Sequence, residues 1–166
     1  MTLFADTGIF EVAGLPAHPL LVHAVVVLIP LTVLALWLGT VWPAARRRLG
    51  IVTPAAAVAV LILVPITAAA GRALAEVVGP LPAVQRHQAF GQALLPWTIA
   101  LFVVAAGQWA WFRYADARVR VRSRRWAHGV VIALGALAFA VGAGSLVMVV
   151  LVGDSGARAV WSGVVG

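Results

Sequence analysis

Long apolar stretches separated by short polar segments dominate the chain. Four of them exceed the roughly 20 helical residues needed to cross about 30 Å of hydrocarbon. They run over residues 20–42, 51–71, 93–112 and 127–152. Apolar and polar residues do not alternate within them, as they do in membrane β-barrels, and unpaired backbone groups are costly in lipid. The pattern therefore predicts an all-α membrane protein, a four-transmembrane-helix bundle that forms one domain over residues 1–166.

Prolines and polar residues suggest where the helices begin and end. Pro19 suits the first position of the first helix, with His18 just before it, because a first-turn residue needs no backbone N–H. Pro65 lies inside the second span and should bend it. The third helix is predicted to restart at Pro82 or Ala83, well before its apolar run. Residues 3–13 mix apolar and acidic side chains, so a short interfacial helix and a floppy tail both stay open.

Composition excludes several classes of protein. Hydrophobic residues make up 63% of the 166 residues and charged residues only 10%, with a mean hydropathy of +1.05. Soluble domains carry about 25% charged residues, and disordered chains carry few apolar ones. A water-soluble enzyme and a disordered protein are therefore excluded. The chain contains no cysteine, which excludes disulfides, thiolate catalysis, cysteine-ligated zinc and iron–sulfur clusters.

The arginines predict the orientation in the membrane. The linkers after the first and third spans carry nine arginines and one acidic residue, a net charge of +8, whereas the other side carries three arginines and four acidic residues, a net charge of −1. By the positive-inside rule these linkers face the cytoplasm, and both termini lie on the extracytoplasmic side. We also expect the arginine linkers to attract anionic lipid headgroups. We expect no nucleic acid as a partner.

Small residues recur at helical spacing in the fourth span. Ala138 and Gly142 are four residues apart, as are Ala140 and Gly144. Such pairs let helix backbones approach closely. The pattern favours a tightly packed face inside the bundle, and it leaves open an interface with a second copy of the chain or with another membrane protein.

Histidines near the span ends are the candidates for chemistry. His23 lies about one and a half turns inside the first span, where an ionisable residue is expensive and is a functional hypothesis by default. Its natural roles are metal or haem ligation and proton relay. A hydrogen bond to a neighbouring helix, or contact with headgroups, is the structural alternative. His18 and His87 are predicted to reach the same outer level, and Asp154 lies just past the outer end of the fourth span.

Two ligand sets follow from this outer cluster. A haem b group needs axial ligands from facing helices at matched depth. His23 and His87 are the predicted pair, although His87 precedes the apolar run by several residues, and Met148 is an alternative ligand. A metal ion held by His18, His23, His87 and Asp154 also fits the residues available. His128 lies alone at the opposite end of the fourth span, so a second haem in that leaflet is not predicted.

Two stretches of the sequence resemble a known family. Gly14-Leu-Pro-Ala-His-Pro-Leu-Leu-Val-His23 resembles the opening of DUF2231 proteins, and Gly153-Asp-Ser-Gly-Ala-Arg-Ala-Val-Trp161 resembles their closing motif. The resemblance implies a small four-span protein of the bacterial inner membrane. Some relatives are fused to Rieske iron–sulfur domains, which implies electron transfer. Asp154 stands where the family pattern often has histidine, which removes one imidazole from that place.

Three functions remain in view. The leading hypothesis is a haem-associated or electron-transfer accessory subunit with its histidine ligands at the outer side. The alternatives are a structural accessory subunit without a cofactor and a metal-handling or transport protein. An ion channel is disfavoured because the span middles are nearly free of polar side chains, and a classical enzyme is disfavoured because no nucleophile–base set is visible.

Overall fold

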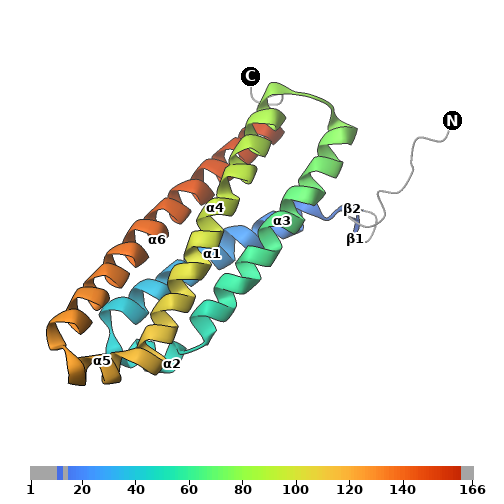
Figure 1. The fold of residues 1–166 in the computed structure, drawn as a ribbon. Coiled ribbons are helices and arrows are strands. Elements are labelled where there is room, and N and C mark those ends of the chain that lie inside the picture. Colours follow the sequence, from blue (N-terminus) through green and yellow to red (C-terminus); the bar gives the residue numbers. More distant parts are fainter. Residues whose placement is uncertain (1–10, 13–14, 162–166) are drawn as a thin grey trace.

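Four long helices form the protein in a computed structural model that describes residues 11–12 and 15–161 (Figure 1). The helices are α1 (His18–Val41), α3 (Val52–Val78), α4 (Pro82–Ala110) and α6 (Arg124–Trp161). Each is long and apolar enough to cross a membrane. The predicted four-helix transmembrane bundle is therefore confirmed.

The helices pack as a closed ring of four neighbours. α1 packs against α3 and α6, and α4 packs against the same two helices, so α1 and α4 face each other diagonally across the bundle. Short connections make consecutive long helices antiparallel. The starts of α1 and α4 and the ends of α3 and α6 thus share one end of the bundle, here called the histidine end. The opposite end, called the arginine end, carries the short helices α2 (Pro43–Leu49) and α5 (Asp116–Arg122).

Helix boundaries differ from the sequence predictions mainly by extension. α4 begins at Pro82 as predicted, but α1 begins at His18 itself, with Ala17 as its N-cap. α6 continues nine residues past Val152, the predicted end of the span, because helix formation does not stop where the apolar run stops. Asp154 consequently lies inside a helix and not beyond one.

Two short features were not predicted. The π-helical turn η2 (Trp111–Ala115) joins α4 to α5 without a break, where the sequence suggested a linker. Strands β1 (Glu11–Val12) and β2 (Leu15–Pro16) pair antiparallel before α1. Residues 3–13, for which an interfacial helix and a floppy tail were both left open, lie mostly outside the described residues; the described part, Glu11–Val12, is this strand and not a helix.

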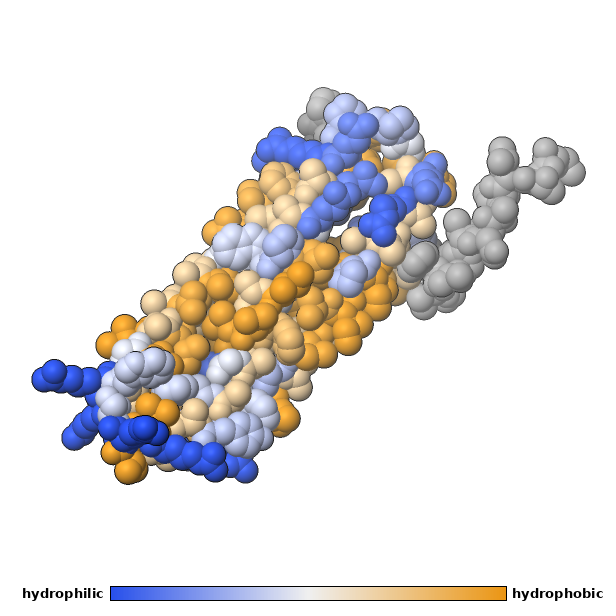
Figure 2. Space-filling view, in the orientation of Figure 1, coloured by the Kyte–Doolittle hydropathy of each residue, from blue (hydrophilic) through white to orange (hydrophobic). Residues whose placement is uncertain are grey.

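The bundle hides a narrow core and leaves a wide apolar exterior. Fully buried side chains such as Ile29, Leu36 and Leu101 line the bundle axis. Large apolar side chains are exposed on every long helix: Leu31 and Leu34 on α1, Ile62 on α3, Ile99 and Val103 on α4, and Ile132 and Val150 on α6. Figure 2 shows this apolar belt between two hydrophilic ends. In water such a large apolar surface would cause the protein to aggregate, so this surface is suited to contact with lipid.

Three of the four small residues singled out in the fourth span, Ala138, Gly142 and Gly144, pack inside the bundle, whereas Ala140 is exposed. Trp37 donates a hydrogen bond from Nε1 to the Ala138 carbonyl oxygen, 2.9 Å away, and its ring covers Gly142. Trp97 covers Gly144 so closely that a Cβ at this glycine would overlap its ring. Indole rings therefore fill the spaces that the missing side chains leave.

Arg46 caps the C-terminal end of α1, which lies at the arginine end of the bundle. Its guanidinium donates to the carbonyl oxygens of Gly39 at 2.6 Å and Thr40 at 2.7 Å, and it stacks over the Phe112 ring at 3.6 Å from the centroid. Cations stabilise the exposed carbonyls at a helix C-terminus. Partial burial lowers the pKa of the Arg46 guanidinium from its ordinary value. Gln108 donates to the Thr40 hydroxyl at 2.7 Å and joins α4 to the same site.

Candidate functional site

Two half-buried histidines meet across the histidine end of the bundle. His18 is the first residue of α1, and His87 lies in the second turn of α4. Their ring centroids are 5.9 Å apart, and the ring planes make an angle of 76°. Because α1 and α4 are diagonal helices, the two imidazoles approach each other over the bundle axis and not around its rim.

Hydrogen bonds indicate that Nδ1 carries a proton in both rings. The Nδ1 atom of His18 lies 3.0 Å from the carbonyl oxygen of Thr67, which only accepts, so Nδ1 carries the proton. The Nδ1 atom of His87 lies 3.1 Å from the Ser155 hydroxyl, and that hydroxyl donates its own proton to the Val152 carbonyl at 3.0 Å. Ser155 therefore accepts from His87. In the neutral form of each imidazole, the lone pair is then on Nε2, the atom that can bind a metal.

Two glycines hold the rings in place. A Cβ atom on Gly71 of α3 would lie 2.8 Å from Cε1 of His18, and a Cβ on Gly156 of α6 would lie 3.1 Å from Cε1 of His87. Both distances are shorter than ordinary carbon contacts of about 3.5–4.0 Å. Each histidine thus rests on the backbone of a helix other than its own, so all four long helices build the pair.

A cavity of about 540 Å³ opens beside the histidine pair. Most of its lining consists of alanine, valine and glycine residues from the four long helices. The polar side chains that line it are those of His18, His23, Arg72, His87, Gln88 and Gln92. Cofactor and small-molecule sites are typically cavities of about 300–1,000 Å³ with apolar walls and a few polar groups. This cavity has that size and that composition.

The other predicted ligands are placed differently. His23 is exposed at the edge of the cavity, and its Nδ1 atom lies 2.6 Å from the Pro19 carbonyl oxygen of its own helix. Met148 packs against the hydrophobic core. Asp154 is exposed and forms an ion pair with Arg158 at 2.9 Å. The structure therefore brings together His18 and His87, and it leaves the two remaining residues of the four-ligand set apart from them.

His128 lies at the arginine end, exposed, with Nδ1 3.3 Å from the Arg124 carbonyl oxygen. This is the isolated interface position predicted for it. Among the residues that the structure describes, no group of three or more histidine, aspartate or glutamate side chains is arranged to hold a metal ion. The chemistry available at the histidine end is therefore that of two imidazoles beside a cavity.

Sequence reasoning missed the residues that support the pair. Ser155 and Gly156 lie next to Asp154, in the closing stretch whose resemblance to a family motif was already visible. Thr67 contributes a backbone carbonyl, and Gly71 contributes the lack of a side chain, so neither carries a sequence signal of its own. The opening stretch, which contains His18, and the closing stretch meet at this site.

Comparison with known proteins agrees with the membrane fold. The family profile described as "Predicted membrane protein (DUF2231)" matches residues 14–166. The match includes both stretches that meet at the histidine pair, and it includes His87 between them. No curated protein and no solved structure matches the chain.

Proposed function

The chain belongs to the DUF2231 family of predicted membrane proteins, and we propose that it is a haem-associated electron-transfer subunit whose axial ligands are His18 and His87. The observation that carries the proposal is the pair of imidazoles, 5.9 Å apart, with both Nδ1 atoms hydrogen-bonded. Such outer hydrogen bonds orient histidine ligands and raise their basicity.

The number of ligands favours haem over a bare metal ion. Zinc sites use three or four protein ligands, whereas the described residues offer two imidazoles without a third ligand nearby. Haem iron receives four nitrogens from its own macrocycle and needs one or two axial ligands from the protein. A macrocycle also needs room, which the neighbouring cavity of about 540 Å³ supplies.

The separation of the rings is compatible with axial ligation. Two imidazoles on opposite sides of one metal ion, each bound at about 2 Å, place their centroids about 6.4 Å apart. The observed centroid separation of 5.9 Å is close to that value. If haem is bound, His18 and His87 would hold it, and the chemistry that it would supply is electron transfer. His18 replaces His23 as the partner of His87 in this proposal.

Haem titration of the detergent-purified protein tests the proposal. We expect a Soret band and bis-histidine spectra in the oxidised and reduced wild type. His18→Ala and His87→Ala should each lose the six-coordinate spectrum, whereas His128→Ala, at the other end, should keep it. Absence of any Soret band after haem loading overturns the proposal and leaves a structural accessory subunit. Metal analysis of the same samples identifies a bare ion if one is bound instead.

The arginine distribution supports placing the protein in a bacterial plasma membrane with the arginine end in the cytoplasm. The absence of native cysteine makes single-cysteine labelling a clean test. Ser123 at the arginine end and Gln85 at the histidine end are both exposed. In intact cells a membrane-impermeant maleimide should label Gln85→Cys and spare Ser123→Cys until the cells are opened. The reverse pattern would contradict this orientation.

A further inference from the structure

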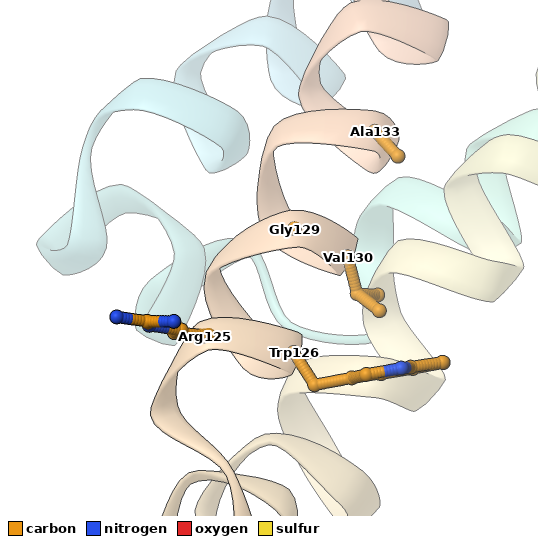
Figure 3. A pocket seen from close by; sticks show the side chains of 5 residues that line it. All are labelled: Arg125, Trp126, Gly129, Val130 and Ala133. Carbon is orange, nitrogen blue, oxygen red and sulfur yellow. The ribbon is translucent and has the colours of Figure 1, made fainter.

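A shallow groove follows the first turns of α6 at the arginine end. It has a volume of about 420 Å³ and is lined by Arg125, Trp126, Gly129, Val130 and Ala133. Figure 3 shows Arg125 and Trp126 projecting to different sides of the helix, with Val130 and Ala133 on the side of Trp126. We propose that this groove, called the α6 groove, binds one anionic phospholipid of the adjacent leaflet, with its phosphate at Arg125 and an acyl chain towards Ala133.

The charge at this end of the bundle is complementary to a phosphate group. Arg120 is paired with Asp116 at 2.8 Å. Within the described part of the chain, Arg118, Arg122, Arg124 and Arg125 form no salt bridge. Guanidinium groups bind phosphate oxygens with paired, charge-assisted hydrogen bonds. Arg125 is the only one of these residues that also lines the groove, so it sets the position of the headgroup.

The direction of the groove matches that of a lipid tail. Arg125 and Ala133 are eight residues apart, which corresponds to about 12 Å along the helix axis. The groove therefore runs from the charged end towards the middle of the apolar belt, as an acyl chain does. Trp126, which is 65% exposed, lies at the charged end of the groove, and tryptophan favours the headgroup level of a bilayer.

Gly129 is what keeps the α6 groove open. A Cβ atom at this position would meet nothing within 4 Å. A larger side chain there would fill the groove without disturbing the interior of the bundle. A Cβ atom on Gly107 of α4 would also meet nothing within 4 Å, and Gly107 is also exposed, but it does not line the groove. The two glycines therefore provide a filling variant and a matched control.

Native mass spectrometry in a neutral detergent can count bound lipids. The wild type should retain one molecule of added dioleoylphosphatidylglycerol, and it should retain this anionic lipid more strongly than the zwitterionic dioleoylphosphatidylcholine. Gly129→Leu should weaken this binding at least fivefold, whereas Gly107→Leu should not change it. Arg125→Gln should weaken it about fivefold, the contribution of one arginine near a charged surface, and Arg47→Gln, which removes an equal charge at the same end, should have a smaller effect.

Four results would overturn the proposal. Equal retention of the anionic and zwitterionic lipids would remove the role of charge. Equal loss of binding in the two leucine variants would remove the role of the groove. Competition by glycerol phosphate as strong as that by the intact lipid would show that a headgroup alone suffices. A change in mass from dimer to monomer on Gly129→Leu, with lipid binding unchanged, would assign the groove to a second copy of the chain.

Discussion

Adding one methyl group beside His18 tests the proposed ligand pair without removing a ligand. In Gly71→Ala the new Cβ would lie 2.8 Å from Cε1 and 3.0 Å from Nδ1 of the imidazole. The ring must retreat by about 0.7 Å to reach an ordinary carbon contact of about 3.5 Å. The retreat is away from α3, which also carries the Thr67 carbonyl, so the hydrogen bond that orients the ring is lengthened.

We expect haem affinity to fall about 10–100-fold, as it does when the outer partner of a metal ligand is lost. The free energy of unfolding should fall by about 1–3 kcal/mol, because the site is overpacked. Haem titration at the Soret band measures the first effect, and unfolding of the haem-free protein by SDS, followed by circular dichroism, measures the second.

Gly91→Ala is the matched control. Gly91 lines the same cavity, and a Cβ there would meet nothing within 4 Å. This variant also adds a methyl group beside the cavity, but it leaves both histidines where they are, so haem affinity should stay within about twofold of the wild type. Wild-type affinity in Gly71→Ala, or an equal loss in Gly91→Ala, would refute the assignment of His18 as a ligand.

The remaining predictions concern packing in the bundle and are measured by SDS-induced unfolding. Gly144→Ala should lower the free energy of unfolding by about 1–3 kcal/mol, because the new Cβ would overlap the Trp97 ring. Adding Trp97→Leu to this variant should restore part of the lost stability. Equal stability of Gly144→Ala and the control Gly107→Ala would contradict this packing. Arg46→Gln should cost about 1.5–3 kcal/mol, since two charged hydrogen bonds to the end of α1 are lost; a neutral effect would mean that water replaces them. Gln108→Leu should cost only about 0.6 kcal/mol, typical of one hydrogen bond in a membrane bundle, and a loss above 2 kcal/mol would contradict that estimate.

The number and order of the membrane helices could be predicted because lipid imposes one length and one kind of secondary structure on every span. The start of α4 at Pro82 could be predicted for a local reason, since proline is favoured in a first turn. The helical linkers α2 and α5 and the π-helical turn η2 could not. Their residues are compatible with both helix and loop, and packing against neighbouring helices decides between them.

Only one member of the proposed ligand pair could be predicted from the sequence. The sequence identifies His87 as an outer ligand candidate, but it favours His23 as the partner because His23 lies inside the first span. His18 and His23 are about 140° apart around α1, and α1 is apolar on nearly every side. The sequence therefore does not indicate which of the two imidazoles faces the bundle axis. Asp154 was singled out for its charge, whereas its neighbour Ser155 carries the contact.

The construction of the histidine pair has a consequence for biogenesis. The two imidazoles come from the first and third long helices, while the atoms that orient them belong to the second and the last. The ribosome must therefore synthesise residue 156 before the pair is complete. Whatever binds there must be loaded after the final helix has inserted into the bilayer, and a truncated or misassembled chain would be recognisable by its failure to retain it.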